Sequence, residues 1–229
     1  MNLINGDCLI ELKKLEDKSI DFVYLDLPYG QTACKWDIKL DLKELWIQLK
    51  RIAKNERTPF FFSCTTKFGF ELFNNAPKGY FRWDLVWEKN RAAGFLNAYR
   101  LPMRKHEMVY CFAKKSPEYD VSSHSEFIQE TGRKGVNKID TYGKKGQKLV
   151  KSKTHKNPLP TSILLDIPSS WCKYKLDEKI NHRTSKPVKL MEFLLKYWSK
   201  EGDTILDPTA GSGSMGVACK NMNRKFIGI

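Results

Sequence analysis

The sequence predicts a single α/β domain, residues 1–229, with a twisted, mostly parallel sheet and helices on both faces. Short apolar segments alternate with amphipathic ones along most of the chain, as in strands that are joined by helices. The segment Ile20–Asp26 has an almost continuous β-branched and aromatic core, which is typical of a parallel strand covered on both faces. A length of 229 residues suits one such domain with an insertion and is too short for two full-sized domains.

The predicted elements follow one another in a strand-helix alternation. The first strand is expected at Leu3–Asp7, where it ends in a turn, and the helix after it carries leucines at three-residue spacing. The second strand, Ile20–Asp26, stops at Pro28 and Gly30. The remaining elements are predicted as a helix over 40–54, a strand over 59–62, a helix over 66–74, strands over 81–87 and 107–112, a helix over 186–198, a strand over 204–206, a helix to about residue 222 and a strand over 225–229.

Basic residues are in excess and are unevenly distributed. Lys and Arg number 40 against 26 Asp and Glu, a formal net charge of +14. Such a surplus suits a polyanionic partner such as nucleic acid, although a solvated lysine-rich surface gives the same count. Between Thr131 and Pro160, nine basic residues accompany one acid, Asp140. Glycines and prolines also interrupt the alternation from about Lys114 to Pro160, so we predict an inserted basic region at 114–160.

Composition disfavours several other classes of protein. No apolar stretch approaches the roughly 18 residues of a membrane span, and the N-terminus lacks the blocks of a signal peptide, so we expect a cytoplasmic protein. The six cysteines include no C-x-x-C pair, which argues against a disulfide framework and a zinc ribbon. Of the four histidines only His182 belongs to a motif, and His106, His124 and His155 show no ligand spacing, so no metal is predicted.

A glycine-rich turn between a short apolar strand and a helix is the first motif with chemical meaning; it runs from Asp203 to Gly216. Glycines let the backbone pass close under a ligand, and a helix N-terminus offers unpaired amide donors. Gly211, Gly213 and Gly216 also fit the dinucleotide pattern G-x-G-x-x-G, so this motif alone leaves a nicotinamide or flavin site open. Because only thirteen residues follow Gly216, N-terminal strands must complete the sheet, an order that a dehydrogenase does not need.

The second motif is Asp26-Leu27-Pro28-Tyr29, which follows the buried strand. It is expected at the carboxyl edge of the sheet, where α/β folds bind ligands. The amino nitrogen of a base is a poor nucleophile, because its lone pair is delocalised into the ring. The Asp26 carboxylate and the Leu27 carbonyl could each accept a hydrogen bond from one of its two protons and so free the lone pair. Tyr29 would stack on the base, which must first leave the duplex. Pro28 stiffens the turn.

These motifs resemble those of the beta-class DNA amino-methyltransferases, in which a D/N/S-P-P-Y/F/W motif precedes the S-adenosylmethionine motif. The resemblance covers most of the chain in the family's order, through segments 5–8, 26–29, 182–187, 207–214 and 224–229. It implies a Rossmann-like methyltransferase fold with a circularly permuted motif order, and S-adenosylmethionine as cofactor. It also implies that the basic region 114–160 is a target-recognition region for double-stranded DNA.

The resemblance assigns roles to individual residues. Those implied in catalysis are Asp26, Leu27, Pro28 and Tyr29. Those implied in cofactor binding are Asp7 at the adenine, Thr184, Ser185 and Lys186 at the methionine end, and Asp207, Pro208, Thr209, Gly211 and Gly213 between them. Those expected on DNA are Arg91, Lys134, Lys144, Lys145 and Lys148.

The chain departs from the family pattern at several positions. Leu27 replaces the first proline, which keeps a backbone carbonyl and loosens the turn. Arg183 and Ser185 replace a usual proline and glutamine. The family also has an acidic residue just after the position of Ile229, where it would bind the cofactor ribose, and we expect its absence to weaken cofactor binding.

The target base and several alternatives follow from the same comparison. An aspartate at the first motif position accompanies adenine methylation in the family, so Asp26 favours the 6-amino group of adenine over the 4-amino group of cytosine. Methylation of cytosine carbon-5 requires a cysteine nucleophile, preceded by proline in that family, and the sequence has no Pro-Cys pair. An RNA or protein-amide substrate, and an inactive DNA-binding protein, are further alternatives. A homodimer and a restriction endonuclease partner are suggested by the resemblance alone.

Overall fold

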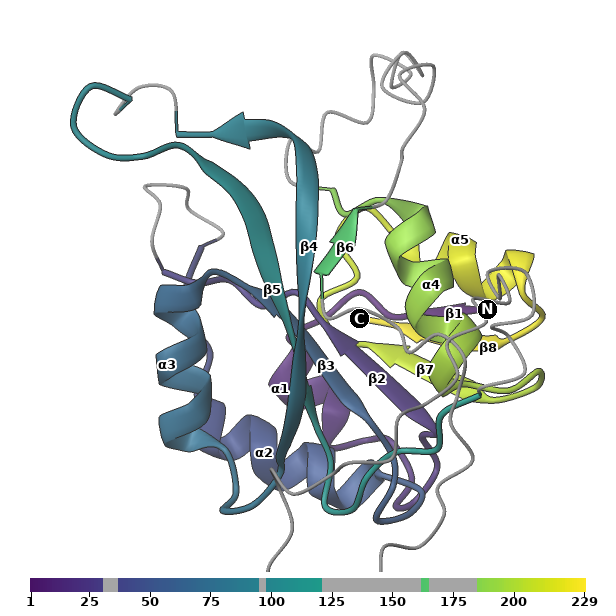
Figure 1. Ribbon diagram of the computed structural model, residues 1–229. Coiled ribbons are helices and arrows are strands. Elements are labelled where there is room, and N and C mark those ends of the chain that lie inside the picture. The colour runs from purple at the N-terminus through teal and green to yellow at the C-terminus, as the bar shows by residue number, and fades with distance from the viewer. Residues whose placement is uncertain (31–36, 95–97, 121–161, 165–184) are drawn as a thin grey trace, which may run out of the picture. The chain divides into compact units, whose positions relative to one another are not determined.

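The central sheet is seen in a computed structural model that describes residues 1–30, 37–94, 98–120, 162–164 and 185–229 (Figure 1). Its strands are β1 (Asn2–Leu3), β2 (Phe22–Leu25), β3 (Phe60–Cys64), β4 (Phe81–Ala93), β5 (Arg104–Phe112), β6 (Ser162–Leu164), β7 (Thr204–Asp207) and β8 (Lys225–Gly228). Within the described residues their order is β1-β8-β7-β2-β3-β5-β4-β6. From β1 to β3 all neighbours are parallel, whereas β5 is antiparallel to both β3 and β4. The sheet is therefore mostly parallel, as predicted.

Strands from the two ends of the sequence lie beside each other at the centre of this sheet. Phe22 and Val23 of β2 pair with Ile205 and Leu206 of β7. β8 pairs with β7 on its other side, and β1 pairs with β8. N-terminal strands thus complete the sheet around the late glycine-rich motif, which confirms the permuted order.

Side chains of β2 alternate between two apolar cores, one on each face of the sheet. Val23 and Leu25 belong to one core, and Phe22 and Tyr24 belong to the other. Successive side chains of a strand point to opposite faces, so a fully apolar strand is stable only if both faces are covered. The four residues of β2 are all buried, in agreement with this requirement.

Helices cover both faces, as predicted (Figure 1). They are α1 (Cys8–Leu12), α2 (Leu42–Ile52), α3 (Thr66–Asn75), α4 (Val188–Trp198) and α5 (Ser214–Asn221). Helices α1, α2 and α3 contribute buried residues to the core that contains Val23, and α4 and α5 to the core that contains Phe22. Side chains cap the first three helices, because Asp7, Asp41 and Thr65 each accept hydrogen bonds from backbone amides of the first turn.

Several boundaries differ from the sequence-based prediction. The second strand begins at Phe22, because Ile20 forms only an isolated bridge with Ala53. The first helix ends at Leu12, one helical turn earlier than the leucine pattern indicates. β4 and β5 are longer than predicted and continue past their neighbours (Figure 1). The three-residue strand β6 was missed, since it adjoins a segment whose composition predicts a loop.

Other expectations are tested only in part. No helix in the described ranges is long and apolar enough to cross a membrane. Among the cysteines whose placement is described, Cys8, Cys64, Cys111 and Cys219 are buried and free. Most of the predicted inserted region 114–160 lies outside the described residues, and its role stays a prediction.

Candidate active site

Two aspartates stand at the ends of the adjacent parallel strands β2 and β7. Asp207 is the last residue of β7, and Asp26 directly follows β2. Because the strands are parallel, both carboxylates lie at the same edge of the sheet. The backbone N–H of Asp26 donates a hydrogen bond to Thr209 Oγ1 at 3.3 Å, which connects the two predicted motifs directly.

Lys186, just before α4, brings a third predicted residue into this site. Its Nζ donates to Asp26 Oδ1 at 2.8 Å and to Oδ2 at 2.7 Å. The Lys186 side chain is only 10% exposed and that of Asp26 25%, so this ion pair is largely withdrawn from water. Nζ also lies 3.5 Å from Glu107 Oε2 of β5, and the other oxygen of Glu107 forms an ion pair with Lys89 of β4. Two carboxylates and two ammonium groups therefore alternate beside the end of β2.

Tyr29 closes the other side of Asp26. Its hydroxyl oxygen lies 3.0 Å from Asp26 Oδ1 and 3.1 Å from the backbone carbonyl oxygen of Ser63, and these two acceptors share its single proton. Its ring packs against Phe68 of α3, with centroids 5.1 Å apart. Leu27 is buried in the core that also contains Val23, so its side chain anchors the turn in place of the family's proline. Pro28 is half-buried.

Burial and ion pairing shift the pKa values of the charged groups. Burial raises the pKa of Asp26, although Lys186 and Tyr29 oppose this shift. Burial likewise disfavours ionisation of Glu107, but the charges of Lys186 and Lys89 outweigh it and hold the pKa of Glu107 below its usual value. Burial alone would lower the pKa of Lys186, whereas its two carboxylate neighbours raise it. The ammonium form of Lys186 is therefore strongly favoured.

The glycine-rich turn lies beside this cluster, between β7 and α5. Gly211 and Gly213 have φ values of +51° and +77°, a region that favours glycine, and Gly213 caps the N-terminus of α5. Pro208 is buried, and Asp207 is buried and accepts a hydrogen bond from the Thr209 amide at 3.1 Å. Burial raises the pKa of Asp207 to about 7. The buried surroundings of the turn therefore disfavour the ionised form of the Asp207 carboxyl group.

A cluster of hydroxyls joins the turn to the segment before α4. Ser185 Oγ lies 2.7 Å from Ser212 Oγ and 3.2 Å from Ser214 Oγ, and Ser212 and Ser214 are 3.1 Å apart. All three hydrogen bonds are exposed to solvent. These three exposed hydroxyls beside the glycine-rich turn are therefore available to a ligand.

The remaining predicted residues are placed less completely. Asp7 follows β1 and accepts hydrogen bonds from Leu9 and Ile10 as the cap of α1, and no described contact joins it to Asp26 or Asp207. Arg91 lies within β4, but its side chain is outside the described part. The predicted residues that lie outside the described ranges altogether are Thr184, Lys134, Lys144, Lys145 and Lys148.

Sequence reasoning missed Glu107 and did not single out Lys89. Glu107 is opposite Trp87 in the β4–β5 ladder, and its side chain is only 14% exposed. An acid within a mainly apolar strand is an available signal, because carboxylates are rarely buried without a partner. Its partners could not be identified from the sequence, since Lys186 is distant along the chain.

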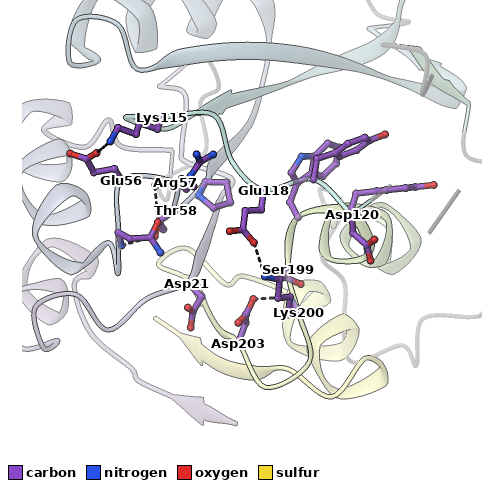
Figure 2. Close-up of a pocket in the computed structure, with 15 residues that line it drawn as sticks. Asp21, Glu56, Arg57, Thr58, Lys115, Glu118, Asp120, Ser199, Lys200 and Asp203 are labelled. Carbon is purple, nitrogen blue, oxygen red and sulfur yellow. Dashed lines mark hydrogen bonds and ion pairs between the residues drawn. The ribbon is translucent and has the colours of Figure 1, made fainter. Parts of the chain in front are cut away.

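A cavity of about 740 Å³ opens at the opposite edge of the sheet (Figure 2). Asp21 precedes β2 and Asp203 precedes β7, so the cavity lies where these strands begin. Lys200 and Glu118 at its wall form an ion pair of 2.6 Å. The groups described above meet at the carboxyl edge instead, and the candidate active site is placed there.

Comparisons with known proteins agree with this architecture. The DNA methylase family model N6_N4_Mtase matches residues 20–229. The DNA adenine methyltransferase YhdJ of Escherichia coli (strain K12) is 26% identical over 241 residues, which cover 99% of this chain and 77% of that protein.

Two solved structures share the fold. The M1.HpyAVI–SAM complex has a TM-score of 0.61 and 21% identity, covering 100% of this chain and 92% of that one. The PvuII DNA methyltransferase (cytosine-N4-specific) has a TM-score of 0.66 and 16% identity, covering 99% and 80% respectively. Since the family model spans nearly the whole sequence, the chain belongs to the N6/N4 DNA methylase family, whose members use S-adenosylmethionine.

Proposed function

We propose that the chain transfers a methyl group from S-adenosylmethionine to the 6-amino group of an adenine that has been flipped out of duplex DNA. The observation that carries the proposal is the position of Asp26. Its carboxylate follows a buried parallel strand, contacts Tyr29, and is joined through its own amide to the Thr209 hydroxyl of the glycine-rich turn. A hydrogen-bond acceptor for an amino group thus adjoins a turn suited to the cofactor.

The described residues fit the chemistry of this cofactor. Gly213 starts α5 at φ +77°, and a Cβ built on it meets no atom within 4 Å, so the turn is open on that side. Ser185, Ser212 and Ser214 offer exposed hydroxyls, and the N-terminus of α5 offers amide donors to a carboxylate. When bound, S-adenosylmethionine would supply a methyl group from a positively charged sulfur, which keeps the electron pair of the broken bond. The lone pair of the target nitrogen would form the new bond, and the nitrogen would then release one of its two protons to the Asp26 carboxylate or to water.

The residues of the second motif prepare the target nitrogen. The Asp26 carboxylate and the Leu27 carbonyl accept hydrogen bonds from the two amino protons, which favours a pyramidal nitrogen with a free lone pair. The carboxylate also stabilises the positive charge that develops on this nitrogen. The Tyr29 ring, supported by Phe68, offers a face on which the base stacks. Positioning and electrostatics are the main contributions, and no covalent enzyme intermediate is required.

Charge supports double-stranded DNA as the partner. The net charge of +14 suits a polyanion, and the basic residues between 131 and 160 would contact phosphates around the target site. The adenine target rests on the aspartate at position 26 and on the similarity to an adenine methyltransferase.

The deciding experiment measures transfer of labelled methyl from S-adenosylmethionine to mixed-sequence duplex DNA, followed by mass spectrometry of the nucleosides. Asp26→Ala should abolish transfer and leave DNA affinity near normal. Asp17→Ala is the matched control, because it removes an aspartate that is 70% exposed and pairs with Arg51. The proposal is supported if the wild type and Asp17→Ala both yield labelled 6-methyladenine and Asp26→Ala does not.

Other outcomes assign the chain differently. Methyl label on the amino group of cytosine would change only the target base. Unlabelled DNA together with intact cofactor binding would point to RNA or protein as substrate. Retained activity in Asp26→Ala would remove this carboxylate from the mechanism.

A further inference from the structure

Glu107 has an unused hydrogen-bond acceptor beside the proposed catalytic carboxylate. Its Oε1 is held by Lys89, whereas its buried Oε2 has no hydrogen-bond partner in the described structure. Oε2 has a long ion-pair contact of 3.5 Å with the Lys186 ammonium, whose hydrogen bonds go to Asp26. A buried oxygen that accepts no hydrogen bond destabilises the fold, and the long ion pair with Lys186 compensates only in part, so the position of Oε2 calls for an explanation.

Asp26 is in the opposite situation. Lys186 donates to both of its oxygens, and Tyr29 donates to Oδ1 as well. An ammonium held this closely weakens the carboxylate as an acceptor for an amino group. It would also repel the positive charge that develops on the attacked nitrogen. The Lys186–Asp26 contact would therefore have to loosen before Asp26 could accept a hydrogen bond from the amino group of a base.

We infer that Glu107 is a positioning residue that receives the Lys186 ammonium when the target base enters, which frees the Asp26 carboxylate for the amino group. The inference rests on the proposed function above. Glu107 itself does not contact the base, and it acts only by providing Lys186 with a second anionic partner.

The positions of the three side chains keep the free-energy cost of moving the Lys186 ammonium small. Lys186 lies between the two carboxylates, and the ammonium needs only a small displacement from Asp26 to reach Oε2. A buried cation that loses its only anion is strongly destabilised, but here it exchanges one anion for another. Lys89 occupies Oε1 and competes for the negative charge of Glu107, but it leaves Oε2 open to the Lys186 ammonium.

The test compares Glu107→Gln with the wild type in two assays. The first assay contains no cofactor and measures base capture. It records the fluorescence of 2-aminopurine placed beside the target base of a duplex oligonucleotide, which rises when the target base leaves the stack. The second measures the single-turnover rate of methyl transfer at saturating cofactor. Glu118→Gln is the matched control, since it neutralises an exposed glutamate that pairs with Lys200 at the opposite edge of the sheet.

We expect Glu107→Gln to weaken base capture and slow transfer by about tenfold to a hundredfold, the range for loss of one charged hydrogen-bond partner. The control should match the wild type. In a Lys186→Met background, Glu107→Gln should cause no further loss of base capture, because no ammonium remains to be moved. An equal loss in both backgrounds would indicate a merely structural role and overturn the inference, as would wild-type behaviour of Glu107→Gln.

A second variant covers the case in which Glu107→Gln does not fold, as judged by thermal unfolding. Lys89→Met removes the competing cation and retains Glu107, so base capture should equal or exceed that of the wild type. Weaker capture by a folded Lys89→Met protein would contradict the inference. If the wild type itself neither captures nor methylates DNA bases, the proposed function fails and the inference with it.

Discussion

The amide of Asp26 donates a hydrogen bond to the hydroxyl of Thr209 across 183 positions of sequence. One residue starts the Asp-Leu-Pro-Tyr turn and the other belongs to the glycine-rich turn. Since β2 and β7 are adjacent and parallel, both turns lie where the strands end, and we expect this bond to help set their spacing. A methyl donor and an acceptor nitrogen must be placed relative to each other with a precision of better than about 1 Å. The spacing of the two turns therefore bears directly on the proposed reaction.

Thr209→Val tests that role, because it keeps the shape of the side chain and removes the acceptor. We expect a stability loss of about 0.5–1.5 kcal/mol, the usual net value of one hydrogen bond, together with slower methyl transfer. Thr209→Ser retains a hydroxyl and should preserve both properties. Urea denaturation and single-turnover kinetics provide the measurements. If Thr209→Val transfers methyl as fast as Thr209→Ser, the bond does not set the spacing of the turns.

The sequence predicted the sheet edge of the site better than the cluster around it. Asp26 and Asp207 could be located because each follows a short apolar strand, and parallel strands end at one edge. The contact of Lys186 with Asp26 depends on how α4 docks on the sheet, which no local pattern specifies. Glu107 meets Lys89 because of the register between β4 and β5, and this register shifts twice along the ladder. Such irregularities arise from tertiary packing and leave no clear periodic signal.

Tyr29 offers a way to separate hydrogen bonding from stacking. Tyr29→Phe removes the bonds to Asp26 and Ser63 and keeps the ring against Phe68, so base capture should be nearly normal. Tyr29→Ala should weaken base capture by about tenfold to a hundredfold, the contribution of one base stacked on an aromatic ring. Cofactor affinity, measured by calorimetry, should change little in either variant. Equal losses of base capture and cofactor affinity in Tyr29→Ala would argue against stacking.

The buried carboxyl group of Asp207 predicts a pH dependence of stability without cofactor. Its pKa is raised from 3.8 to about 7 by burial, so the folded protein holds this proton over a range in which the unfolded chain has lost it. The resulting stabilisation is complete below about pH 4 and is lost as pH rises through 7. Between pH 6 and 8 the free energy of unfolding should therefore fall, by on the order of 1 kcal/mol from this group.

Asp207→Asn removes the titration and keeps an oxygen for the Thr209 amide. Its free energy of unfolding, from urea titrations at pH 6 and 8, should vary less with pH than that of the wild type. Some dependence should remain, because burial raises the pKa of Asp26 in the same direction. An unchanged slope in Asp207→Asn would show that Asp207 is ionised throughout this range.

Gly213 and Gly202 form a matched pair for testing the proposed cofactor turn. Both have positive φ values, +77° and +84°, and a Cβ added to either would meet no atom within 4 Å. Alanine at each position should therefore cost a similar backbone strain of about 1–2 kcal/mol, measured by chemical denaturation.

Only Gly213→Ala should also weaken S-adenosylmethionine binding in calorimetry, because Gly213 is the N-cap of α5 in the turn between β7 and that helix. Gly202 precedes β7 at the opposite end of the strand, so its variant reports the effect of strain alone. Equal cofactor affinities in the two variants would indicate that the ligand does not approach Gly213.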